Sequence, residues 1–273
     1  MTQVTPKRCV VLALCRSFPG RMVLAVLLAL FLSCSLSAQN TLMVAAASNL
    51  GPALREISAS FERRSGTHVA LVFGSSGSLA TQIQNGAPYD VFLSADLDYP
   101  RRLESQGLAE LGSLVTYASG KLVLWAPKTL AVDLLRLGMK ALTAPQVRKI
   151  AIANPEHAPY GKAAAAALRR ANLYDAVRSK LVLGEDVAQT AQFVLSGNAQ
   201  IGIIPLSLAI SPELSRAGQR WELPPDSYPR LEQAAVVLRK TRHERLAHEF
   251  VTYLTTEEVA NIFRRYGYGV QRP

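Results

Sequence analysis

The sequence predicts an α/β protein with two lobes, each built around a largely parallel sheet flanked by helices. Apolar strands alternate with helices along the chain, which is typical of βαβ units. The alternation stops at a strand-like segment, 120–127, and then starts again. A second strand-like segment at 231–238 returns the chain to its first half. We therefore expect lobe 1 to comprise 39–121 and 238–273, and lobe 2 to comprise 122–237.

In the first lobe, short apolar runs predict strands, and apolar stripes predict helices. The first helix has Leu50, Leu54, Ile57 and Phe61 at intervals of three or four residues. Gly107 is a suitable stop for the last helix. The expected strands are 41–47, 68–73, 89–96 and 120–127, and the expected helices are 49–64, 78–85 and 99–106.

The second half repeats this organisation. A helical turn at 143–147 is followed by a strand and an alanine-rich helix, and the chain closes with two amphipathic helices. The expected strands are 149–153, 180–186, 199–205 and 234–240. The expected helices are 162–172, one from 174 to near 179, 187–196, 242–253 and 256–266.

Residues 1–38 have the plan of a secretory signal peptide. A basic segment without acidic residues precedes an apolar run at 22–32, and small residues follow. The run is short for a membrane span, although a retained anchor and lipid attachment at Cys34 are alternatives. All three cysteines lie in this leader, so thiol catalysis and cysteine metal sites are excluded from the rest of the chain.

The charge of the chain does not indicate a nucleic-acid partner. The formal net charge is +10, but part of the excess lies in the leader. The remaining basic residues are spread along the sequence, and no basic cluster is interleaved with aromatic residues. We expect no nucleic-acid binding.

Four predicted helices begin directly after apolar strands, with small polar residues or free backbone groups at their first turns. The N-terminus of a helix carries unpaired N–H groups and a partial positive charge, so it can bind an anion. Capping alone is the simpler alternative for any single serine. Four such starts, two in each lobe, predict a cleft for a small anion. They are Ser48-Asn49, Ser75 to Ser78, Tyr160-Gly161 and Asp186-Val187.

The predicted cleft offers hydrogen-bond donors but no cation. Such a site suits a fully deprotonated oxyanion, because a protonated anion needs an acceptor carboxylate. Lys162 is the nearby cation, and we expect it on a solvated helix face. Gly74, Gly77 and Gly161 allow the backbone to approach a ligand closely.

No set of residues has catalytic or metal-binding spacing, so we predict neither an enzyme nor a cofactor. A hydrolase with Ser76 as nucleophile is an alternative, but no base is evident for it. Asp90 and Asp96 flank a strand and are expected to have structural roles. His157 is expected to be a surface turn residue, and orientation of the third loop is the alternative.

Six stretches resemble the periplasmic molybdate-binding proteins of ABC transporters. They cover nearly the whole chain after the leader, in the family's order. The resemblance implies a type II periplasmic binding-protein fold and capture of molybdate, with tungstate as a second ligand. It also implies a membrane permease as partner, a periplasmic location and a monomer. The stretches are "AAASNL", "FGSSGSLATQI", "NGAPYDVFLSAD", "NPEHAPYGKAA", "GEDVAQT" and "IFRRYGYGV".

The resemblance also implies the ligand-binding residues. The oxyanion would be held by hydroxyl and amide groups of the first two loops and by backbone N–H groups of the other two. Some family members add a tyrosine where this chain has Pro205, which can donate nothing, so more weight falls on Asn49. The expected residues are Ser48, Asn49, Ser76, Tyr160 and Val187.

Two further alternatives stay open at this point. The same fold could bind sulfate, thiosulfate or an organic acid, which arginine or lysine in the cleft would favour. A ligand sensor for a membrane receptor would have the same sequence features as a transport protein.

Overall fold

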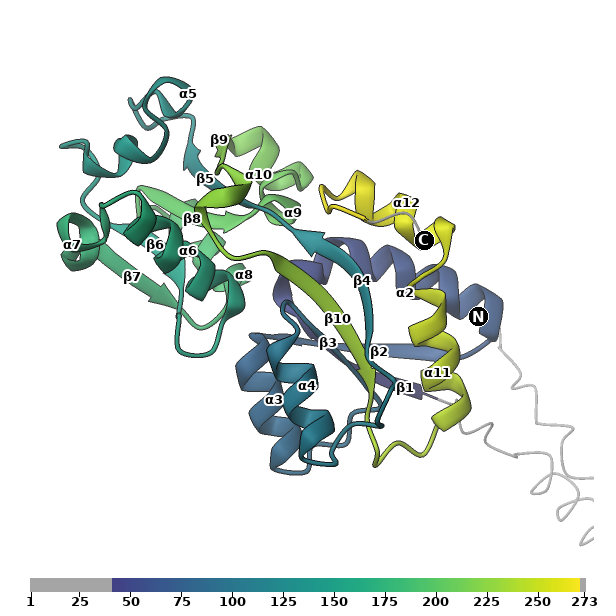
Figure 1. Cartoon of the computed structure of the whole chain (residues 1–273). Coiled ribbons are helices and arrows are strands. Elements are labelled where there is room, and N and C mark those ends of the chain that lie inside the picture. The colour runs from purple at the N-terminus through teal and green to yellow at the C-terminus, as the bar shows by residue number, and fades with distance from the viewer. Residues whose placement is uncertain (1–40, 271–273) are drawn as a thin grey trace, which may run out of the picture. The chain divides into compact units, whose positions relative to one another are not determined.

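Residues 41–270 are described by a computed structural model, and they contain two five-stranded sheets (Figure 1). The expected signal peptide and Cys34 lie outside the described residues. Both sheets mix parallel and antiparallel strands, and helices flank them, so the predicted α/β class is confirmed. No helix within 41–270 combines the length and the apolar character needed to cross a bilayer.

The first sheet has the strand order β2-β1-β3-β10-β4. β1 pairs in parallel with β2 and with β3, while β10 is antiparallel to both β3 and β4. The interior strand β1 is apolar from residue 42 to residue 47, as a strand covered on both faces requires. The strands are β1 Thr41–Ala47, β2 His68–Gly74, β3 Val91–Ser94, β4 Val115–Gly120 and β10 Leu231–Val237.

Alternate residues of β1 contribute to two separate cores. Val44 faces a core that contains Leu54, Phe61 and Phe250, whereas Ala45 faces a core with Leu79. Side chains alternate across a strand, so helices cover both faces of this sheet. The helices on the first core are α2 Gly51–Ser65, α11 Glu244–Tyr253 and α12 Glu257–Arg265, and those on the second are α3 Ser76–Gln84 and α4 Asp98–Ser105 (Figure 1).

The second sheet repeats this topology, with the order β7-β6-β8-β5-β9. As in the first sheet, three mutually parallel strands are followed by one strand, β5, that is antiparallel to both of its neighbours, and then by the edge strand β9. The strands are β5 Leu122–Pro127, β6 Ile150–Ala153, β7 Leu181–Gly184, β8 Ile201–Pro205 and β9 Gly218–Glu222. The larger helices around it are α6 Pro159–Arg170 and α8 Val187–Leu195, and the shorter ones are α5 Leu134–Leu137, α7 Tyr174–Val177, α9 Leu206–Ala209 and α10 Pro212–Ala217.

Four short 3-10 segments complete the described chain. One of them, η1, directly joins β1 to α2 and contains two of the expected ligand residues. The segments are η1 Ser48–Leu50, η2 Gly138–Thr143, η3 Arg178–Lys180 and η4 Pro225–Ser227.

The strand β10 requires a correction to the expected lobe boundaries. Its residues 231–237 were assigned to the second lobe, but they pair with β3 and β4 of the first sheet. The chain therefore returns to the first sheet before Leu231 and not at 238. The apolar pattern of this strand is the same in either sheet, so the sequence could not reveal its partners.

Two strands were missed, and two helix starts were placed too late. β4 has few large apolar residues, and β9 is a polar edge strand, so neither shows a strand pattern. α3 begins at Ser76 instead of residue 78, and α6 begins at Pro159 instead of residue 162. Proline fits the first helical position because its missing N–H has no partner there anyway. These shifts bring Ser76 and Tyr160 into the first turns of their helices.

Candidate functional site

The five expected ligand residues line one small pocket. It lies where loops after β1 and β2 of the first sheet meet loops after β6 and β7 of the second. Its volume is about 10 Å³, which is room for roughly one water molecule. A tetrahedral oxyanion is larger, so its access requires these loops to move apart. The lining residues are Ala47, Ser48, Asn49, Gly74, Ser75, Ser76, Ala95, Ala158, Pro159, Tyr160, Asp186 and Val187.

The second loop presents Ser76 at the start of α3. Ser75 caps this helix, since its hydroxyl oxygen accepts a hydrogen bond from the Ser78 N–H. The Ser76 oxygen accepts from the buried Ala95 N–H at 3.0 Å. Accepting this bond leaves the Ser76 hydroxyl proton able to donate into the pocket.

The third and fourth loops present backbone donors. Tyr160 is the second residue of α6, and Val187 is the first residue of α8. First-turn N–H groups have no acceptor within their own helix, and the helix dipole adds partial positive charge there. Both positions therefore suit an anion, as the resemblance implies.

The side chain of Tyr160 has a different environment from its backbone N–H group. It is 2% exposed, and burial raises the pKa of its hydroxyl well above the usual value. Within residues 41–270 that hydroxyl has no hydrogen bond of good geometry, although the Gln233 amide lies beside it. Gly120 leaves space for it, because a Cβ there would lie 1.9 Å from the hydroxyl oxygen.

The Tyr160 hydroxyl can be tested separately from the Tyr160 N–H. We expect Tyr160→Phe to leave anion affinity unchanged, and to leave the free energy of unfolding unchanged or raise it by about 1 kcal/mol, since an unpaired buried polar group is removed. Calorimetric titration and chemical denaturation measure the two effects. A large loss of affinity would show that the hydroxyl takes part in binding.

Asn49 is almost fully buried, and its side-chain donors are already used. Its amide group donates to Gln233 Oε1 and to the Tyr268 hydroxyl, both at 2.9 Å. Its backbone carbonyl oxygen accepts from the hydroxyls of Ser207 and Tyr268, whereas its side-chain oxygen Oδ1 has no hydrogen-bond partner among the described residues. In this arrangement Asn49 ties η1 to β10 and to the C-terminal segment, and its side-chain amide is not free to donate to a ligand.

Asp186 is a pocket residue that the sequence analysis did not include among the ligand residues. Its carboxylate caps α8 by accepting from the Gln189 N–H, and its other oxygen accepts from the Ser48 hydroxyl at 2.6 Å. The expectation of a site made of donors alone is therefore wrong, because one carboxylate lines it. The signal was available: an aspartate before Val187 is a typical helix cap.

Lys162 is exposed on α6, as expected of a solvated helix face. Its ammonium group lies 5.1 Å from the centre of the Tyr99 ring, which belongs to α4. Burial raises the pKa of the Asp96 carboxyl, and the positive charge of Lys162 acts against this rise. The two aspartates flanking β3 have structural contacts: Asp90 accepts from the Met43 N–H, and Asp96 accepts from the Tyr99 N–H.

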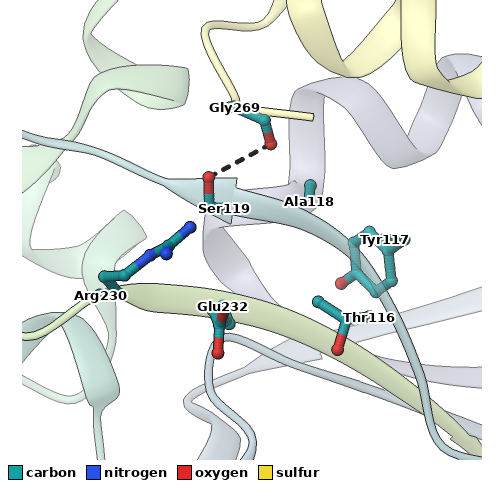
Figure 2. Close-up of a pocket in the computed structure, with 7 residues that line it drawn as sticks. All are labelled: Thr116, Tyr117, Ala118, Ser119, Arg230, Glu232 and Gly269. Carbon is teal, nitrogen blue, oxygen red and sulfur yellow. Dashed lines mark hydrogen bonds between the residues drawn. The ribbon is translucent and has the colours of Figure 1, made fainter. Parts of the chain in front are cut away.

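A second pocket, of about 80 Å³, lies between β4, β10 and the C-terminal segment (Figure 2). Arg230 and Glu232 line it with opposite charges, so it has no preference for anions comparable to a set of helix N-termini. Ser119 lines it as well, with its hydroxyl donating to the Gly269 carbonyl. None of the five expected ligand residues lines this pocket.

Comparisons with known proteins agree with this placement. Residues 42–269 match the model of a family described as bacterial extracellular solute-binding protein. The molybdate-binding protein ModA of Azotobacter vinelandii is 39% identical over 240 residues, which is 88% of this chain and 94% of the relative. ModA of Rhodobacter capsulatus is 37% identical over 85% of this chain and 89% of the relative.

A solved structure has the same fold. The periplasmic molybdate-binding protein of Azotobacter vinelandii matches with a TM-score of 0.79 and 35% identity, and the match covers 85% of this chain and all of that one. The type II binding-protein fold expected from the resemblance is confirmed by this match. The serine hydrolase alternative is not supported, because the similar proteins bind solutes.

Proposed function

The chain belongs to the bacterial extracellular solute-binding proteins, within them to the ModA molybdate-binding family, and we propose that it captures molybdate for an ABC importer. One observation carries the proposal: four strand-to-helix loops, two from each sheet, meet at a single pocket. Proteins of this kind bind their solute and pass it on, so the chain is not an enzyme.

The proposed site holds the oxyanion by hydrogen bonds alone. Ser76 donates its hydroxyl, and Ser76, Tyr160 and Val187 donate first-turn N–H groups. Ser48 donates its hydroxyl after it leaves Asp186. The contribution of Asn49 is limited to its backbone N–H, since its side-chain amide is held by Gln233 and Tyr268.

Selectivity for molybdate over sulfate follows from cavity size in this proposal. Molybdate and sulfate are both tetrahedral dianions with the same hydrogen-bond acceptors, so size is what distinguishes them. The loops must therefore close at a spacing set by molybdate, the larger anion. Tungstate resembles molybdate in charge and shape, and we include it as a second ligand. We also propose that the protein is a monomer that acts in the periplasm, binds no resident cofactor and docks on a membrane permease.

Isothermal titration with molybdate, tungstate, sulfate and phosphate tests the assignment. We expect tight one-to-one binding of molybdate and tungstate, and no heat from sulfate or phosphate. Heat from sulfate or phosphate with none from molybdate would favour the alternative of another small anion in the same fold.

Ser76→Ala tests the donor with the clearest geometry. We expect a loss of molybdate binding free energy of about 1–3 kcal/mol, the value of a hydrogen bond to a charged group. The Ala95 N–H loses its acceptor as well, so thermal unfolding of the ligand-free variant must be recorded beside the titration. Unchanged affinity would remove Ser76 from the site.

A further inference from the structure

His157 joins the third loop to the second loop beside the pocket. Its carbonyl oxygen accepts from the Gly77 N–H at 2.8 Å, and its Nδ1 atom lies 2.8 Å from the Ser75 hydroxyl. Ser75 and Gly77 are the neighbours of Ser76, and His157 precedes Tyr160 by three residues. The two contacts therefore connect the segments that carry two of the proposed donors.

The loop that carries His157 is held firmly against the second sheet. The Asn154 carbonyl accepts from the N–H groups of both His157 and Ala158, and the Asn154 side chain accepts from the Glu156 N–H. The Asn154 N–H in turn donates to the Gly184 carbonyl at the end of β7. These hydrogen bonds therefore couple the position of His157 to the third and fourth loops together.

The other ring nitrogen of His157 makes a weaker contact. Its Nε2 atom lies 3.5 Å from a carboxylate oxygen of Glu185, whose side chain is 77% exposed. Exposed ion pairs contribute little to stability. Both residues belong to the second sheet's loops, so the Ser75 contact is the side-chain bond of His157 that reaches the first sheet.

These contacts lie beside the pocket and do not cross it. Ser75 lines the pocket, but neither His157 nor Gly77 does, in contrast to Ser48 and Asp186, whose mutual hydrogen bond crosses it. The pocket is too small for an oxyanion to pass without separation of the loops. Any bond that joins the loops beside the pocket must therefore break before the anion leaves.

We propose that His157 is a positioning residue that holds the second and third loops together over the bound anion and slows its release. It does so through Ser75 and touches no ligand atom. The inference rests on the proposed capture of an oxyanion, and it assigns a kinetic role to a residue that the sequence analysis placed on a surface turn.

Release of radiolabelled molybdate into excess unlabelled molybdate tests the proposal. In His157→Ala we expect roughly three- to tenfold faster release, the effect of one lost hydrogen bond, with an unchanged association rate. His157→Asn should restore slow release, because its side-chain amide, which offers both a donor and an acceptor, takes the place of Nδ1. His157→Gln should not, because its amide reaches the position of Nε2.

A matched control separates this role from the general loss of a histidine. His68 also pairs with a glutamate, Glu62, at 2.8 Å, and it lies at the start of β2, away from the pocket. We expect His68→Ala to release molybdate at the wild-type rate. Wild-type release from His157→Ala, or rescue by glutamine and not by asparagine, would overturn the proposal.

A ligand-free measurement distinguishes failure of this inference from failure of the proposed function. Spin labels at Arg101 of α4 and Arg170 of α6, both exposed, report the distance between the helices of the first sheet and those of the second. The chain's three cysteines, all within residues 1–38, are replaced by serine. We expect His157→Ala to lengthen or broaden the label distance and His157→Asn to restore it, whether or not molybdate binds. An unchanged distance in His157→Ala would overturn the role of His157.

Discussion

Gly77→Ala is expected to weaken molybdate binding by about 2–4 kcal/mol, the combined cost of overpacking and a lost hydrogen bond. A Cβ at this position would lie 2.5 Å from the Tyr99 hydroxyl and 2.6 Å from the His157 carbonyl oxygen. The tyrosine can rotate, but the carbonyl belongs to the backbone of the third loop. The two loops must therefore separate, and the hydrogen bond from the Gly77 N–H is lost.

The stability of the ligand-free variant should not fall in parallel. Gly77 lies in the first turn of α3, and alanine is favoured over glycine in helices by about 1 kcal/mol. Gly51→Ala is a matched control, since a Cβ there meets nothing closer than 3.4 Å in the first turn of α2. Titration of both variants, with thermal unfolding, separates the effects. Wild-type affinity in Gly77→Ala would show that the loops do not need this close approach.

Trp125→Ala is expected to reduce the free energy of unfolding by about 3–5 kcal/mol, the usual cost of removing a large buried aromatic side chain. Trp125 lies in the middle of β5 and is 1% exposed. Its indole N–H donates to the Leu214 carbonyl at 3.2 Å. Gly218 provides the space for the ring, because a Cβ there would lie 2.2 Å from it.

Chemical denaturation followed by circular dichroism measures this loss without relying on tryptophan fluorescence. Trp221→Ala is the control, since Trp221 lies on the edge strand β9 and is only half-buried. It should cost less than Trp125→Ala. An equal or larger loss in the control would mean that the second sheet does not depend on the core around Trp125.

Much of the site could be predicted from the sequence because its parts are local. A strand that ends in small polar residues at a helix start is visible in consecutive residues, as with Ala47 and Ser48 or Gly74 and Ser75. The physical properties that make such a start attractive to an anion, free N–H groups and a helix dipole, are also local. The four helix starts and the alternation of strands and helices therefore needed no tertiary structure, whereas the five proposed ligand residues came from the family resemblance.

The remaining features depend on partners far away in the sequence. Asn49 is equally suited to bind a ligand or to support the fold, and only its contacts with Gln233 and Tyr268 decide which role its side chain has. Lys162 and His157 follow polar patterns typical of surfaces, yet they contact Tyr99 and Ser75 of the first sheet.

By itself the sequence determined the α/β class, the four anion-attracting helix starts and, through its resemblance, the family. The tertiary structure decided which sheet receives β10, that the Asp186 carboxylate enters the pocket, and which residues join the loops around it. The reason is physical: helix starts and apolar periodicity arise within a few residues, whereas strand pairing and the contacts between loops are set by packing of segments that lie far apart in the sequence, as with Ser75 and His157, which are 82 residues apart.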